Sequence, residues 1–171
     1  MPANPLHELR INARELLRVP GSTRGVSTTV AADALGLVDD RIIGDISVDV
    51  HAVSSIEGIV VTGTVMVPWR TVCRRCLTPV TGSAVVDVTE VYQDEVGGDD
   101  AFPIEGDQID LVPAVREYVM LDLPDGPLCR EDCAGICPSC GVDRNADPCT
   151  CDTTVVDERW AALDGLQFDD D

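Results

Sequence analysis

The sequence predicts an α+β fold in which an antiparallel β-meander or partly closed barrel carries a covering helix and a C-terminal cysteine-rich module. Three observations predict it. Apolar and polar residues alternate between residues 42 and 93, one stretch at 110–123 has helical spacing, and six of the eight cysteines lie between residues 129 and 151. A domain typically spans about 100–200 residues. We therefore expect an α+β core domain at 1–125 and a separate module at 126–171.

The first forty residues predict one brief helix after an extended opening. Ala13, Leu16 and Leu17 form a short amphipathic run, and Pro20 and Gly21 stop it. Residues 27–41 are rich in alanine and aspartate and fit a helix or a loop.

Three strands are predicted next. Apolar residues alternate from Ile46 to Ala52 and from Ile59 to Trp69, and the segment SSIEG between these runs supplies a hairpin connection. Residues 79–93 repeat the alternation. Strands of this kind form an antiparallel meander with one face in water.

A loop and a helix follow the strands. The segment QDEVGGDDAFPIEGDQ, rich in acids and glycine, predicts a solvated surface loop. Asp110 then stands as a candidate N-cap for a helix that Pro124 ends, and this helix is expected to cover the sheet. Beyond the cysteines, Trp160 and Leu163 share one face of a short terminal helix.

The chain is strongly acidic, with a formal net charge of −19. All 12 positive residues are arginine, and residues 1–30 are locally basic, with four arginines against two glutamates. Broad RNA binding is disfavoured, because that affinity comes mainly from lysine and arginine on phosphates. The acidity favours solubility, or attraction to a basic partner such as a ribosomal protein.

The compartment decides how the cysteines are interpreted. No apolar run approaches the ~20 residues that cross a bilayer, and the N-terminal residues show no export pattern. We therefore expect a cytoplasmic protein with no membrane contact, in which thiols stay reduced and clustered cysteines indicate a metal.

Cys137-Pro-Ser-Cys140-Gly141 is the strongest sign of a zinc site. Two thiolates separated by two residues face one ion when the backbone between them turns tightly, and a following glycine relieves that turn. Zinc would contribute about 10–16 kcal/mol to a segment too small to bury a core. One site or two sites both remain open, as does the grouping of the candidate ligands: Cys73, Cys76, Cys129, Cys133, Cys137, Cys140, Cys149 and Cys151.

The two histidines, His7 and His51, are remote from these cysteines in sequence. A site made only of sulfur is closed and structural, whereas a catalytic zinc keeps an open position. No phosphate-binding glycine loop, nucleophile elbow or HExxH helix is present. We expect neither an enzyme nor a small-molecule substrate.

The chain resembles the YceD family of large-subunit ribosomal RNA accumulation proteins. The resemblance rests on ELLRVPGS, CRRC, IDLVPAVREYVMLDLP, LCREDCAGICPSCGVDRNADPCTC and DERWAALDGL, and spans nearly the whole chain. It implies a protein needed for normal levels of large-subunit rRNA. Carried over by position, its CxRC element falls on Cys73, Arg75 and Cys76, its CxGxCPxCG element begins at Cys133, and its CxC ends at Cys151.

Three functional hypotheses follow. The first is a non-enzymatic factor in ribosome assembly that contacts a basic ribosomal protein or large-subunit precursor rRNA. The second is a thiol-redox protein that uses Cys73 and Cys76, where neighbouring arginines would lower a thiol pKa. The third is direct RNA binding through the zinc element, with Arg70 beside the candidate partner-binding residues Arg74, Arg75, Arg130 and Arg144.

Overall fold

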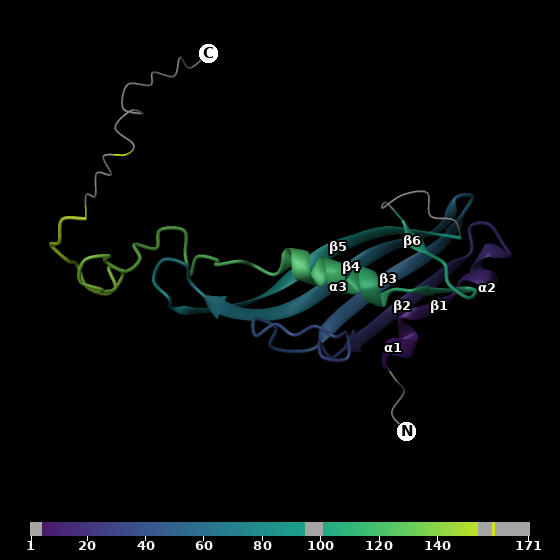
Figure 1. The fold of residues 1–171 in the computed structure, drawn as a ribbon, viewed down its shortest axis with the longest axis horizontal. Helices are drawn as coiled ribbons and strands as arrows, with labels where there is room; N and C mark the ends of the chain where they lie inside the picture. Colours follow the sequence, from purple (N-terminus) through teal and green to yellow (C-terminus); the bar gives the residue numbers. More distant parts are fainter. Residues whose placement is uncertain (1–4, 95–100, 154–158, 160–171) are drawn as a thin grey trace, which may run out of the picture.

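A computed structural model describes residues 5–94, 101–153 and 159 of the chain (Figure 1). It is an α+β structure with a mostly antiparallel sheet, as the sequence predicts. The elements are, in order, α1 (Pro5–Glu8), β1 (Arg10–Asn12), α2 (Ala13–Leu17), β2 (Thr23–Val30), β3 (Ile46–Ser55), β4 (Gly58–Val72), β5 (Pro79–Gln93), β6 (Phe102–Pro103), β7 (Gln108–Asp110) and α3 (Val112–Asp122).

The main sheet has five strands in the order β2-β3-β4-β5-β6. Strands β2 to β5 form an antiparallel meander, and β6 pairs with β5 in parallel. The sheet is open, with β2 at one edge and the two-residue β6 at the other. The alternative of a partly closed barrel is therefore wrong, because β2 and β6 lie at opposite edges and do not pair.

The alternation seen in the sequence matches the burial of the strands. In β3, Ile46, Val48, Val50 and Ala52 are buried while the intervening residues are more exposed. The buried face packs against α3, which contacts β4 and β5 (Figure 1). The same core contains further buried apolar residues from the rest of the chain: Leu9, Ile11, Leu16, Val26, Val30, Leu35, Ile59, Val61, Val65, Val67, Val88, Tyr92, Ile109, Leu111, Val115 and Val119.

Helix α3 confirms the predicted covering helix and corrects its start. The residue in the cap position is Leu111, and it makes no side-chain cap bond. Asp110 acts one position earlier, where its carboxylate accepts a hydrogen bond from the backbone N–H of Val112 at 2.9 Å. At the other end the helix stops at Asp122, two residues before Pro124, because proline cannot continue it.

The N-terminal region holds more structure than the sequence predicts. The predicted brief helix is α2, but α1 and β1 precede it, and β1 pairs with β7 so that Ile11 lies opposite Ile109. Strand β2 was also not foreseen, because in TRGVSTTV only Val26 and Val30 are fully apolar and buried, so the segment shows no period of two.

The predicted loop after β5 contains a strand. Phe102 in β6 stacks on Tyr92, with ring centroids 5.4 Å apart, so apolar contact holds this short segment against the sheet. Residues 95–100 and the predicted terminal helix with Trp160 and Leu163 lie outside the described residues. The division into domains at 1–125 and 126–171 stays a prediction. None of the described helices is long and apolar enough to span a membrane.

Gly63 is a point where β3 and β4 leave no room for a side chain. Its φ is 155°, and a Cβ built there would lie 2.5 Å from Val50 Cα and would collide with the Asp49 carbonyl. We expect Gly63→Ala to lower the free energy of unfolding by roughly 1–3 kcal/mol, as overpacking does, measured by urea denaturation. Gly25→Ala is the control, because its nearest neighbour is 3.9 Å away. Equal stability of the two variants would contradict this packing.

Candidate metal centre

The eight cysteines form two groups of four. The inner cluster consists of Cys73, Cys76, Cys129 and Cys133, and the outer cluster of Cys137, Cys140, Cys149 and Cys151. Within each group all sulfur atoms lie within 4.8 Å of one another, so each group could hold a metal ion. The structure thus resolves the grouping that the sequence left open.

The sulfur positions of the inner cluster fit a single tetrahedral ion. Thiolates about 2.3 Å from a zinc ion in a regular tetrahedron are about 3.8 Å apart. The sulfurs of Cys73 and Cys133 are 3.8 Å apart, and those of Cys76 and Cys129 are 3.6 Å apart. The cluster therefore has the size of one four-sulfur site.

The inner cluster joins two distant parts of the chain. Cys73 and Cys76 lie in the turn after β4, whereas Cys129 and Cys133 follow α3 and the segment around Pro127. Cys73 and Cys133 are buried, and Val80, Leu128 and Ile136 pack around the cluster. The outer cluster is built from residues 137–151 alone, and only Cys137 of its four cysteines is buried. The inner cluster is therefore the one that attaches the cysteine-rich segment to the sheet.

Each cluster begins with the same backbone turn. The N–H of Leu77 donates to the Cys73 carbonyl at 2.9 Å, and the N–H of Gly141 donates to the Cys137 carbonyl at the same distance. Leu77 and Gly141 both have positive φ, at 61° and 76°. Leucine costs roughly 1–2 kcal/mol in this conformation, where glycine costs nothing. Leu77 therefore occupies a strained glycine-like position, and its side chain is 59% exposed.

These turns favour the thiolate form of the first cysteine. Burial raises the pKa of Cys73, but backbone N–H groups of Cys76, Cys129 and Arg75 outweigh it and lower that pKa to about 6. The backbone N–H groups of Cys140 and Ser139 likewise lower the pKa of Cys137 to about 6, against burial. Since a thiolate is the metal-binding form, each turn prepares one ligand before an ion arrives.

In each cluster another cysteine has a pKa that is raised and not lowered. Burial is the largest cause that raises the pKa of Cys129 to about 12, and thiol contacts add to it. The contact with Cys140 is the first cause that raises the pKa of Cys151 to about 12. Four crowded sulfurs cannot all be charged without a cation between them. A bound cation would relieve this repulsion in both clusters.

Main-chain contacts connect the two clusters. The N–H of Ile136 donates to the Arg75 carbonyl at 2.9 Å, and the N–H of Arg144 donates to the Gly135 carbonyl at 2.9 Å. Gly135 has φ 73°, and a Cβ there would lie 3.0 Å from the Arg75 carbonyl oxygen. Glycine adopts a positive φ without strain and has no Cβ to crowd the Arg75 carbonyl. Gly135 therefore lets the outer segment lie against the Cys73–Cys76 turn.

Asn145 connects the clusters through its side chain. It lies between Cys140 and Cys149 of the outer cluster, yet its Nδ2 donates to the sulfur of Cys133 in the inner cluster at 3.5 Å. Its Oδ1 accepts from the N–H of Ala134 at 2.8 Å and from the Arg130 guanidinium at 2.7 Å. An ordered outer loop therefore supports a ligand of the inner cluster.

Two of the four candidate partner-binding arginines make side-chain contacts around the clusters. Arg75 donates to the Cys133 carbonyl at 3.0 Å, and Arg130 binds Asp132 and Asn145. Arg75 therefore connects the β4–β5 turn to the cysteine-rich segment, whereas Arg130 makes its contacts within that segment. All four arginines are nevertheless exposed at the surface.

The two histidines, which we did not expect to be ligands, lie elsewhere. His7 is in α1 and His51 in β3, and neither belongs to a cluster. Asn145 and Leu77 were not predicted from the sequence, whereas Gly135 falls on the glycine of the CxGxCPxCG element that the family resemblance implies. A comparison of CRRCL with CPSCG would have indicated Leu77, because the same turn requires a left-handed residue in both.

A family model and several relatives match the chain. A family model described as "Large ribosomal RNA subunit accumulation protein YceD" matches residues 61–167. An uncharacterized protein of Mycobacterium tuberculosis (strain ATCC 25618 / H37Rv) is 35% identical over 172 residues, which cover 91% of this chain and 79% of the relative. The YlbN protein of Bacillus subtilis is 29% identical over 116 residues, or 65% of each chain.

A plant relative carries the family name. "Large ribosomal RNA subunit accumulation protein YCED homolog 1, chloroplastic" of Arabidopsis thaliana is 30% identical over 66 residues, which cover 39% of this chain and 21% of the relative. No solved structure matches the chain.

The two clusters predict different responses to the loss of one ligand. We expect Cys140→Ala to lose the ion of the outer cluster and keep the inner one, because the inner ligands are the more buried. Cys76→Ala should loosen the attachment of the segment to the β4–β5 turn. Elemental analysis measures the metal content of both variants, and limited proteolysis measures how firmly the segment is attached. Ser139→Ala, next to Cys140, is the control. Full metal content in both cysteine variants would contradict the grouping.

Asn145 predicts communication between the clusters. We expect Asn145→Ala to weaken metal retention in the inner cluster by about 10–100-fold, as removal of such supporting hydrogen bonds does. The rate of metal transfer to a chromogenic chelator measures it. Asp147→Ala changes an exposed residue of the same loop and should match the unaltered protein. Identical transfer rates for both variants would show that Asn145 does not connect the clusters.

Proposed function

Because the chain belongs to the YceD family of large ribosomal RNA subunit accumulation proteins, we propose that it supports large-subunit rRNA accumulation and ribosome assembly as a non-enzymatic factor. Family membership is the observation that carries this proposal, and it confirms the resemblance found in the sequence. The plant relative is itself described as a large ribosomal RNA subunit accumulation protein.

The proposed metal is zinc, with one ion in each cluster. Four-sulfur sets at tetrahedral spacing are typical of zinc or of iron–sulfur sites, and zinc needs no redox partner. The sulfur separations of 3.6 and 3.8 Å in the inner cluster support a single ion there. Zinc would supply folding free energy to a segment with little apolar area of its own.

The composition of the two clusters supports a structural metal and a protein that is not an enzyme. Each cluster offers four thiolates and contains no histidine or carboxylate, so a bound zinc would keep no open position for water or substrate. The redox alternative for Cys73 and Cys76 is supported less, because Cys73 is fully buried and its sulfur lies among three others. A dithiol that exchanges with other proteins needs an accessible sulfur.

Charge supports a basic partner. At a net charge of −19 the surface attracts a lysine- and arginine-rich ribosomal protein and repels nucleic acid at long range. Large-subunit precursor rRNA remains the other proposed partner. Its proposed contacts are four exposed arginines, Arg74, Arg75, Arg130 and Arg144. The cytoplasm is the proposed compartment, since it keeps the thiols reduced.

Depletion of the protein in its own host tests the proposal. We expect the ratio of large-subunit to small-subunit rRNA to fall, because the large-subunit rRNA would no longer accumulate normally. Quantitative gel analysis of total RNA measures the ratio. Expression of the Ser139→Ala variant in the depleted host should restore the ratio, whereas expression of the double variant Cys76→Ala/Cys129→Ala should not.

Affinity purification gives the second measurement. The tagged protein should recover a large-subunit ribosomal protein or precursor rRNA at low salt and release it as salt rises, because the proposed contact is electrostatic. An unchanged rRNA ratio after depletion, together with no ribosomal component recovered at low salt, would refute the proposal.

A further inference from the structure

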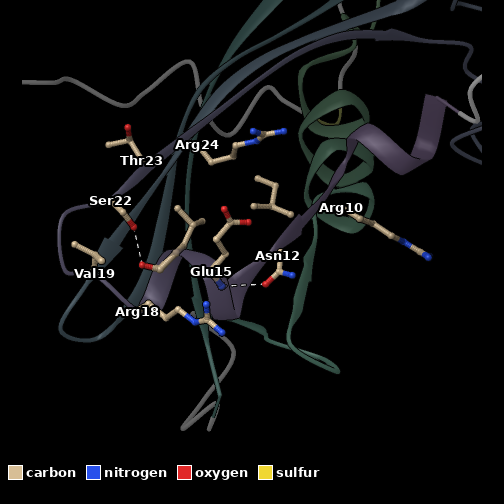
Figure 2. A pocket seen from close by; sticks show the side chains of 10 residues that line it. Arg10, Asn12, Glu15, Arg18, Val19, Ser22, Thr23 and Arg24 are labelled. Carbon is tan, nitrogen blue, oxygen red and sulfur yellow. Dashed lines mark hydrogen bonds between the residues drawn. The ribbon is translucent and has the colours of Figure 1, made fainter.

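A hollow of about 540 Å³ lies between β1, α2 and the start of β2 (Figure 2). It is at the end of the molecule opposite to the cysteine-rich segment (Figure 1). Its apolar lining consists of the buried residues Ile11 and Leu16 and the exposed residue Val19. Its polar lining consists of Arg10, Asn12, Glu15, Arg18, Ser22, Thr23 and Arg24.

The hollow gathers positive charge on an otherwise acidic chain. Three of the 12 arginines line it, and they come from β1, the end of α2 and β2. Arg10 lies 3.5 Å from Asp110, but none of the ion pairs among the described residues involves Arg18 or Arg24. Two guanidinium groups are therefore available to an anion.

A second hollow of about 370 Å³ extends the first along β2. The two share Arg10, Ile11 and Arg24, and the second adds His7, Glu8, Gly25, Val26 and Ser27. Arg24 stands where they meet. A trough of this length suits an anion attached to a larger group better than a lone inorganic ion.

Glu15 narrows the chemistry of the ligand. Figure 2 shows its side chain between Arg18 and Arg24, while Arg10 points away from them. The ionised side chains of an acidic peptide only accept hydrogen bonds and have no hydrogen to donate to Glu15. A ribose carries hydroxyl groups beside its phosphate, and a carboxylate that accepts from a ribose hydroxyl is a recurring feature of nucleotide sites.

We propose that this hollow binds a ribonucleotide, with Arg18 and Arg24 on the phosphate and Glu15 on a ribose hydroxyl. Guanidinium groups match the oxygens of phosphate in paired hydrogen bonds. The hollow has no aromatic residue in its lining, so it reads the sugar–phosphate backbone and not the base. The 2′-hydroxyl is the group that distinguishes RNA from DNA at such a site.

The net charge of the chain does not prevent this. Exposed charges are screened beyond about 8 Å at physiological salt, so the arginines beside the ligand dominate. A free ribonucleotide and a segment of single-stranded RNA present the same chemistry. The site goes beyond the proposed function, because it requires no ribosomal partner and lies apart from the cysteine clusters.

Binding of labelled oligonucleotides to the full, metal-loaded chain tests the site. The probes are a uridine RNA of about eight nucleotides, within the usual length of single-strand sites, and its DNA counterpart. Fluorescence anisotropy gives the affinities, and uridine 5′-monophosphate, inorganic phosphate and a glutamate-rich peptide serve as competitors. Arg116→Gln, in α3, is the matched control, because Arg116 is an exposed arginine that lines neither hollow.

We expect saturable binding that favours RNA. Arg18→Gln/Arg24→Gln should weaken it at least about tenfold, and the slope of log affinity against log salt should fall by about 0.7 for each phosphate that is no longer neutralised. Glu15→Ala should remove the preference for RNA over DNA. All three variants change exposed side chains, so circular dichroism and metal content should stay unchanged.

The competitors identify the source of the ligand. Displacement of the RNA by the mononucleotide at similar affinity indicates a free ribonucleotide, and displacement only by RNA indicates a strand. Either result supports the site. Absence of saturable binding, equal binding by the arginine double variant, abolished binding in Arg116→Gln, or stronger competition by the peptide than by the mononucleotide would overturn it. None of these outcomes would alter the rRNA ratio measured on depletion, so the two proposals fail separately.

Discussion

The convergence of four cysteine sulfurs from two distant segments is the constraint on which the far end of this molecule depends. The pairs of the inner cluster that come closest are separated by 53 and 60 residues in sequence. The apolar contacts around them are few, with Val80, Leu128 and Ile136 packed against three buried cysteines. Coordination of one ion by these sulfurs would replace the hydrophobic core that so short a segment cannot build.

The outer cluster gains its position from the inner one. The Arg75 carbonyl, Gly135 and the Asn145 side chain connect the two, so the segment behaves as a linked pair of sites and not as separate loops. The repeated turn at Cys73 and Cys137 has different costs in the two places. Leu77 carries backbone strain and an exposed apolar side chain where Gly141 carries neither.

The elements with a repeating apolar pattern could be predicted from the sequence, whereas those that depend on a single contact could not. Alternating apolar residues predicted β3, β4 and β5, and apolar residues at helical spacing predicted α3. In a half-buried strand or helix the buried positions recur with the period of that structure. Strand β2 lacks that period, and Phe102 joins the sheet through one ring contact with Tyr92. The eight cysteines were evident from spacing, but their grouping depends on how the chain folds back. Asn145 acts through geometry that no local pattern encodes.

The two ends of the molecule differ in chemistry, with two clusters of cysteine sulfurs at one end and a hollow lined by arginines at the other. The central claim is that a metal ion makes the cysteine end rigid. Hydrogen exchange of the backbone amides of Leu77, Ile136 and Cys137, with and without a strong chelator, tests it most directly. The account predicts that these amides lose protection when the metal is removed while those of β3 and β4 keep it. Equal protection in both conditions would contradict it.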